Sequence, residues 1–205
     1  MRPIIPISPI KYAFAVTIPL ALALSVQGAP GRPKYVNNAA LTQAFIRAVS
    51  AGNLRKMQIL LSESVNPAAT GENGEIALYL AADGGLTRSV NFLLDHGVSA
   101  KNKNGDEALF AAICDGHTGV VKALLRHGAN ANARDSDGAM PLMIACFYDT
   151  HEGVIGQSPD IVRLLLLYKA DVKAKDNHGK TALMYLKNAP NARTHGMLLK
   201  AGAVK

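Results

Sequence analysis

Pairs of adjacent leucines recur along this chain at nearly constant spacing. The pairs are Leu60-Leu61, Leu93-Leu94, Leu124-Leu125, Leu165-Leu166 and Leu198-Leu199, and their numbers rise by 33, 31, 41 and 33 from one pair to the next. A glycine series, Gly74, Gly105, Gly138 and Gly179, rises by similar steps of 31, 33 and 41. A period of about 33 residues predicts stacked repeats, each too small to bury its apolar face alone. Such stacks mostly bind other molecules, so the period limits function as well as fold.

One repeat shows the expected local structure. Asn104-Gly105 predicts a turn, and the apolar stripe of residues 108–113 predicts a helix after it. A break at Gly116 separates that helix from a second one at residues 120–125. The glycines that follow the second helices suit a left-handed helix cap, and these are Gly97, Gly128 and Gly202. We therefore expect pairs of antiparallel helices joined by projecting loops.

The repeat resembles an ankyrin repeat. Three segments carry the resemblance: Gly-His-x-x-Val-Val-x-x-Leu-Leu at 116–125, Gly-Ala-Asn-Ala-Asn-Ala at 128–133 and Gly-Lys-Thr-Ala-Leu at 179–183. The resemblance implies an all-α solenoid of about five helix-turn-helix units with short β-turn or hairpin loops, over residues 38–205. Apolar residues replace most of the usual Thr-Pro-Leu-His motif. We therefore expect the histidine hydrogen-bond network at the start of the first helix to be absent.

The N-terminal segment has the pattern of a secretory signal. Arg2 and Lys11 precede the apolar run Tyr12–Val26, and Val26 and Gly28 suit the two small-residue subsites of a cleavage site. An uncleaved membrane anchor is the alternative, but about 15 residues span only about 22 Å as a helix, against about 30 Å of hydrocarbon. The expected organisation is a signal peptide at 1–28, a flexible linker at 29–37 and the repeat domain at 38–205. The expected location is periplasmic or secreted.

Charge and cysteine content exclude several classes of function. Removing residues 1–28 takes 2 of the 22 basic residues and none of the 15 acidic ones, so the mature charge is 20 − 15 = +5. A nucleic-acid partner is not expected, because basic clusters with interleaved aromatics are missing. The register argues against a disulfide between Cys114 and Cys146, because Cys146 aligns with Ile113. We find no pattern for a metal, a cofactor or a catalytic site, and expect neither an enzyme nor a membrane contact after cleavage.

The expected partner-binding residues lie at loop tips and at variable positions of the first helices. The candidates are Lys101, Lys103, Asp115, Arg134, Asp135, Phe147, Tyr148, Lys175, Asn177 and His178. The alternative is that the charged tips are simply solvated. Phe147 and Tyr148 are the preferred pair, because aromatic anchors are enriched in interfaces. The longest step between leucine pairs places an inserted loop near 149–158, and either a neutral or a functional insertion fits it.

Two function hypotheses follow. The first is a non-catalytic, exported module that binds one folded protein through its loop tips and the concave face of its first helices. The resemblance to small exported ankyrin proteins implies a protective role there, in stress defence or toxin neutralisation. The second is a secreted effector that binds host proteins.

Overall fold

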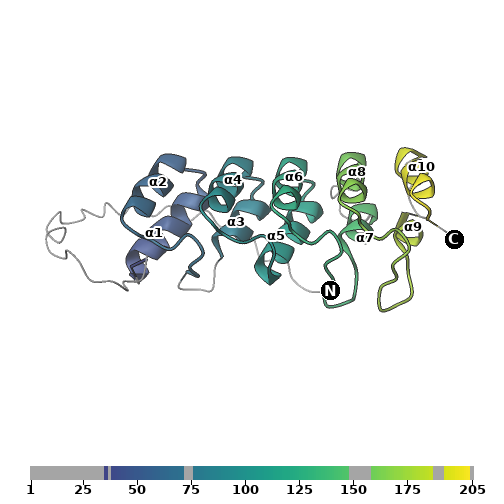
Figure 1. The fold of residues 1–205 in the computed structure, drawn as a ribbon, viewed down its shortest axis with the longest axis horizontal. Coiled ribbons are helices and arrows are strands. Elements are labelled where there is room, and N and C mark those ends of the chain that lie inside the picture. The colour runs from purple at the N-terminus through teal and green to yellow at the C-terminus, as the bar shows by residue number, and fades with distance from the viewer. Residues whose placement is uncertain (1–34, 37, 72–75, 148–157, 187–191, 204–205) are drawn as a thin grey trace, which may run out of the picture. The chain divides into compact units, whose positions relative to one another are not determined.

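The computed structural model describes residues 35–36, 38–71, 76–147, 158–186 and 192–203. Its helices follow one another in pairs (Figure 1). The first helices of the pairs are α1 (Ala39–Ser50), α3 (Ala77–Asp83), α5 (Lys103–Cys114), α7 (Pro141–Cys146) and α9 (Ala182–Tyr185). The second helices are α2 (Leu54–Ser62), α4 (Thr87–Asp95), α6 (Thr118–Arg126), α8 (Pro159–Leu167) and α10 (Ala192–Lys200). The expected all-α repeat solenoid is confirmed.

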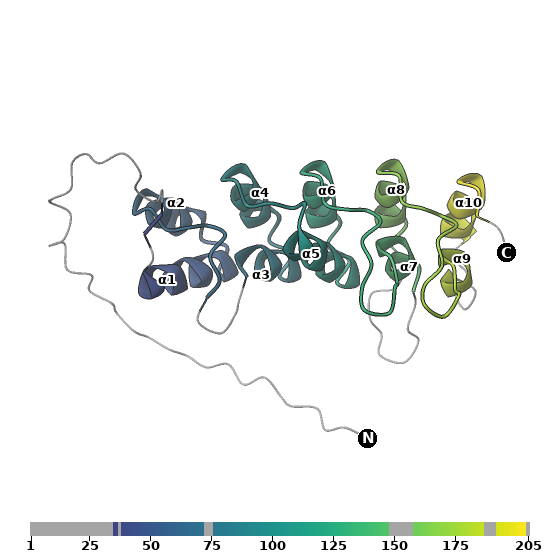
Figure 2. The same ribbon diagram turned by 60° about the horizontal axis from the view of Figure 1, so that its bottom comes forward.

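Two layers of helices result from serial packing. Each first helix contacts the first helix of the next pair, from α1 through α9. The second helices α2, α4, α6, α8 and α10 pack in the same serial order (Figures 1 and 2). The described residues from Tyr35 onward form one compact unit. The segment expected to be the signal peptide, 1–28, lies outside the described residues and stays a prediction.

The leucine pairs hold the second-helix layer together. The first leucine of every pair is buried, from Leu60 at 3% exposure to Leu198 at 0%. Full burial of such a side chain contributes about 1.5–3 kcal/mol relative to exposure. The second leucine is buried in the second and third repeats (Leu94 and Leu125) and partly buried at Leu61 and Leu166, whereas Leu199 in the last repeat is 47% exposed. The last repeat therefore lacks a neighbour on one side, as expected of a terminal unit.

Small residues set the distance between first helices. Ala81, Ala82 and Ala112 are fully buried, in helices α3 and α5, which contact each other directly. A side chain that ends at Cβ lets two helix backbones approach closely, so these alanines explain the tight first-helix layer. The expected left-handed glycine caps also occur, since Gly97, Gly128 and Gly202 have φ of 88°, 90° and 94°.

Polar side chains cap the first turn of several helices. Ser158 accepts a hydrogen bond from the backbone N–H of Ile161 at 3.3 Å, Pro159 occupies the first turn of α8, and Asp160 is acidic in that turn. The inserted loop before this cap lies outside the described residues. At the start of α9, the buried hydroxyl of Thr181 has no hydrogen-bond partner. That orphan hydroxyl agrees with the expected loss of the usual polar network at the helix start.

The start of α5 contradicts the sequence expectation. Asn104-Gly105 was expected to be a turn before a helix at 108–113, but both residues lie inside α5, which begins at Lys103. Asn102 caps the helix by accepting a hydrogen bond from the N–H of Gly105 at 3.1 Å. The step from Leu93 to Leu124 is two residues shorter than the usual 33. In place of a hairpin, the residues before 108 form the first turn of α5.

Candidate functional site

Four connections join successive repeats, and we number them in chain order. Loop 1 is residues 63–76, of which 72–75 are not described; loop 2 is 96–102, loop 3 is 127–140 and loop 4 is 168–181. Loops 3 and 4 project from the first-helix side, whereas loop 2 is short (Figures 1 and 2). The candidate site is built on loops 3 and 4.

An aspartate organises each of these two loops in the same way. The Oδ1 atom of Asp135 accepts hydrogen bonds from the N–H groups of Asp137 and Ala139, at 2.9 and 2.8 Å. The carboxylate of Asp176, at the equivalent position of loop 4, accepts from the N–H groups of His178 and Lys180 at the same two distances. In both loops a backbone hydrogen bond closes the turn, to Asp135 O in loop 3 and to Asp176 O in loop 4. Each carboxylate therefore fixes its own turn before any partner is present.

Hydrogen bonds also join loop 3 to loop 4. The backbone N–H of Asn177 donates to the carbonyl of Asp137 at 3.0 Å. The guanidinium of Arg134 donates to the carbonyl of Gly138 at 2.8 Å and to that of Lys175 at 3.0 Å. The two loops are thus held side by side as one platform, which we call the loop 3–4 platform (residues 134–139 and 175–180).

Tyr185 connects this platform to the first helices. Its hydroxyl donates to the carboxylate of Asp176 at 2.5 Å, and its ring meets the ring of Phe147 edge-on with centroids 5.9 Å apart. The ammonium of Lys180 lies 5.5 Å from the centre of the same ring. The hydrogen bond to Asp176, with burial, raises the pKa of Tyr185 to about 12, and the same bond lowers the pKa of Asp176. Tyr185 is therefore a neutral donor at physiological pH, held between the platform and Phe147.

The middle repeats bring acidic groups near an exposed aromatic ring. Tyr79 of α3 is 39% exposed, and burial followed by the charges of Asp83 and Asp115 raises its pKa. Asp115 is the C-cap residue of α5. Burial and the neighbouring Asp115 also raise the pKa of the Cys114 thiol. Tyr79 and Cys114 are exposed and Asp115 is partly exposed, so this region of α3 and α5 can also contact a partner.

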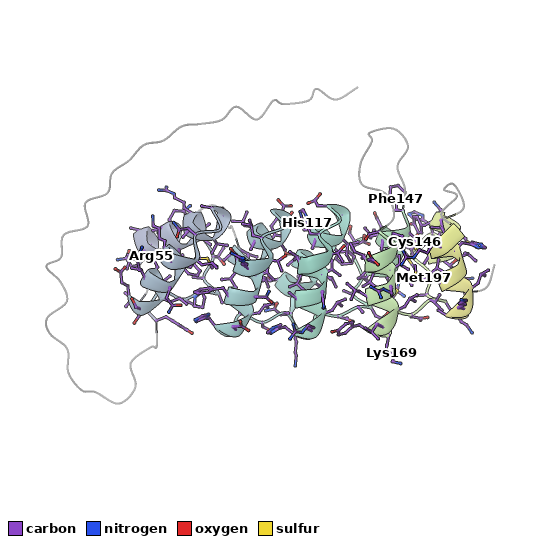
Figure 3. The ribbon with its side chains drawn as sticks, turned by 90° about the horizontal axis from the view of Figure 1, so that it is seen from above. Arg55, His117, Cys146, Phe147, Lys169 and Met197 are labelled. Carbon is purple, nitrogen blue, oxygen red and sulfur yellow. The ribbon has the colours of Figure 1, made fainter. Side chains whose placement is uncertain are left out.

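The structure brings together some of the residues predicted from the sequence. Five lie on the loop 3–4 platform, namely Arg134, Asp135, Lys175, Asn177 and His178. Phe147 is 52% exposed and reaches the platform through Tyr185. Figure 3 places Phe147 and His117 on one side of the row of helices and Lys169 on the other. Tyr148, the second residue of the preferred aromatic pair, lies outside the described residues.

Lys101 and Lys103 do not form the expected loop tip. Lys103 lies in the first turn of α5, with its ammonium 3.7 Å from Glu107, and loop 2 ends at the cap residue Asn102. The stem of Lys101 lies along Gly128, since a Cβ built there would be 2.6 Å from Lys101 Cε. The physical reason is the shortened step in this repeat, which leaves no room for a hairpin tip. Asp115 is separate from the platform and belongs to the α3–α5 region.

Sequence reasoning missed two residues that position the platform. These residues are Tyr185 and Asn132. The side chain of Asn132 joins the start of loop 4 to loop 3: it accepts a hydrogen bond from the N–H of Asp171 at 2.7 Å and donates one to the carbonyl of Lys169 at 3.0 Å. The equivalent positions of Asp135 and Asp176 in their repeats were a readable signal for paired turns. The register gives no comparable signal for Tyr185.

Both cysteines are free thiols. Cys114 is exposed and Cys146 is buried, as the register predicts for a variable and a core position. Burial raises the pKa of Cys146 to about 12. Within the described ranges, no group of three or more metal-ligating side chains occurs, and no helix there is long and apolar enough to cross a membrane.

The comparison with protein families agrees with this architecture. The family model for ankyrin repeats (3 copies) matches residues 45–135 and again 90–176. The match covers more than half of the chain, so the protein belongs to the ankyrin-repeat family. Ankyrin repeats are in general protein–protein interaction modules. No curated protein matches the sequence.

Proposed function

We propose that this protein is an exported, non-catalytic module that binds one folded protein through the loop 3–4 platform and the adjoining ends of its first helices. The observation that carries the proposal is the platform itself. Two exposed loops are fixed to each other by the bonds of Arg134 and Asn177, and the half-exposed ring of Phe147 lies beside them. A surface ordered before binding loses little conformational entropy when a partner docks.

Export, the protective role and the class of partner are proposed from the sequence. The positively charged and apolar pattern of residues 1–28 supports export, to the periplasm or beyond the cell. A protective role, in stress defence or toxin neutralisation, is what the resemblance to small exported ankyrin proteins implies. The partner class is a folded protein, with no nucleic acid, membrane, metal or cofactor required. The alternative is a secreted effector that binds host proteins.

Cell fractionation separates the two hypotheses. Protein retained in the periplasm supports the first and contradicts the effector hypothesis, whereas protein in the medium does the reverse. Protein that stays in the cytoplasm with residues 1–28 intact contradicts export altogether.

Capture of a partner tests the binding surface. The purified chain is immobilised and compared with the variants Phe147→Ala and Leu167→Ala, where Leu167 is a matched control because it is 70% exposed on α8, away from the platform. We expect Phe147→Ala to weaken capture of the same protein by about tenfold, since truncating an aromatic anchor typically costs more than about 1 kcal/mol. Leu167→Ala is expected to capture as wild type. If both variants weaken capture equally, or if neither weakens it, Phe147 is not part of the binding site.

A further inference from the structure

Loop 4 is attached to loop 3 through two backbone groups of its own. The N–H of Asn177 donates to the carbonyl of Asp137, and the carbonyl of Lys175 accepts from the guanidinium of Arg134. By the register of the two repeats, the equivalent groups of loop 3 are the N–H of Ser136 and the carbonyl of Arg134. In the described part of the chain neither group has a hydrogen-bond partner. Among the described residues, one edge of loop 3 is therefore paired and the opposite edge is open.

The open edge exists because loop 2 is not a hairpin. In the register of the preceding repeat, Asn104 is the counterpart of Asp137 and would present its carbonyl to Ser136 if loop 2 projected as loop 3 does. Asn104 lies in α5 instead, where backbone groups bond along the helix. The counterpart of Arg134 is Lys101, whose stem covers Gly128 rather than reaching the Arg134 carbonyl. The Asn104 carbonyl thus belongs to α5, and no hydrogen bond joins the Lys101 ammonium to the Arg134 carbonyl.

Unpaired backbone groups at an exposed edge are a ready template for another chain. Ser136 and Arg134 are both exposed, so an extended segment can reach them. We propose that an extended segment of the protein partner adds to this edge of loop 3, in the place that a hairpin of loop 2 would occupy. The inference rests on the proposed function, because it names how that partner is held.

The hydrogen-bond pattern defines the chemistry of the segment. A backbone carbonyl of the partner accepts from the Ser136 N–H, and a side-chain N–H of the partner donates to the Arg134 carbonyl. An arginine or lysine suits the second position, because the carboxylates of Asp135 and Asp137 lie beside it in the chain. Main-chain bonds of this kind supply affinity, and side chains supply selectivity.

Two substitutions at Ser136 separate the contribution of its backbone N–H from that of its hydroxyl. Ser136 is the second residue of a turn closed by the Gly138 N–H to the Asp135 carbonyl, a position where proline is favoured. Ser136→Pro therefore removes the donor and keeps the turn, while Ser136→Ala removes only the hydroxyl and is the matched control. The probe is a cyclised synthetic peptide with the sequence of residues 129–140, which offers the same carbonyl and guanidinium that loop 3 offers to loop 4.

Amide NMR of the full chain gives the direct readout. We expect the peptide, at millimolar concentration, to shift the Ser136 amide in wild type and to bind Ser136→Ala equally. Ser136→Pro is expected to bind about tenfold more weakly, as the loss of one hydrogen bond that leaves its acceptor unpaired implies. No shift of the Ser136 amide, or equal binding by Ser136→Pro, overturns the inference.

Capture from a periplasmic extract separates this inference from the proposed function. A protein held by wild type and Ser136→Ala but lost by Ser136→Pro supports the inference. A protein held equally by all three chains overturns the inference and leaves the proposed function standing. Absence of any specifically captured protein overturns the proposed function, while the peptide measurement still decides whether the edge can pair.

Discussion

Loop 2 and loop 3 connect equivalent helices but have different structures. Loop 3 (127–140) forms a closed turn bonded to loop 4, whereas loop 2 (96–102) is half as long and passes directly into α5. The residues from Lys103 onward, which would form the second strand of a hairpin in loop 2, are instead the first turn of α5. Their helix begins with the Asn102 cap and packs through Gly105 against the backbone of Ala100.

This difference shows how a small change in length redirects backbone hydrogen bonds. Inside α5 the carbonyls of the first turn accept hydrogen bonds along the helix, and Asn102 accepts from the N–H groups of Gly105 and Asp106. Loop 3 of the next repeat then has no Asn104 carbonyl with which the Ser136 N–H could pair. The shortening of loop 2 therefore has its consequence in loop 3, where the Ser136 N–H has no partner among the residues that the structure describes.

The largest expected effect is at Gly105. A Cβ at this position would lie 2.2 Å from the Ala100 carbonyl oxygen, so Gly105→Ala must move backbone atoms. We expect the free energy of unfolding to fall by about 3 kcal/mol, as for strong overpacking. Gly196→Ala in α10 is the control, because no atom lies within 4 Å of its Cβ position, and it is expected to gain up to about 1 kcal/mol. Urea denaturation measures both, and a stabilised Gly105→Ala would mean that helix propensity, not packing, governs the start of α5.

A smaller effect distinguishes the two edges of loop 3. Asn177→Pro removes the N–H that donates to Asp137, so we expect the free energy of unfolding to fall by about 1–2 kcal/mol. Ser136→Pro, at the equivalent turn position, breaks no bond within the described chain and is expected to be neutral or stabilising by up to about 1 kcal/mol. Thermal unfolding of the two variants gives the comparison. Equal losses of stability would show that the edge at Ser136 is already paired.

The smallest effect is a pH dependence within the loop 3–4 platform. The pKa of Asp176 is lowered chiefly by the Tyr185 hydrogen bond, so the ionised carboxylate stabilises the fold. This contribution is fully present above the ordinary carboxyl value of 3.8 and is lost as pH falls through the lowered pKa. We expect the Tm difference between wild type and Tyr185→Phe to be constant near neutral pH and to narrow below about pH 4. A difference that widens on acidification would show that the bond does not favour the carboxylate.

The repeat register predicted most of the fold because it reports burial directly. The leucine pairs, the small residues of the first helices and the glycine caps are each required by the packing of a helix pair, so they recur with the period. The register also placed Arg134, Asp135, Lys175 and Asn177 at loop tips. It was wrong for Lys103 and for Asn104-Gly105, because a glycine after asparagine suits both a turn and a capped helix start. The shortened step before α5 and the close approach of Gly105 to Ala100 go with the helix start.

The sequence alone determined the class of fold and the order and number of the expected repeats, because apolar periodicity specifies which residues must be buried. Tertiary structure decided where α5 begins, how loops 3 and 4 are joined and that Tyr185 connects them to Phe147. Those features depend on hydrogen bonds between residues of different repeats and on close backbone contacts. Neither leaves a period in the sequence, because each occurs once in the chain.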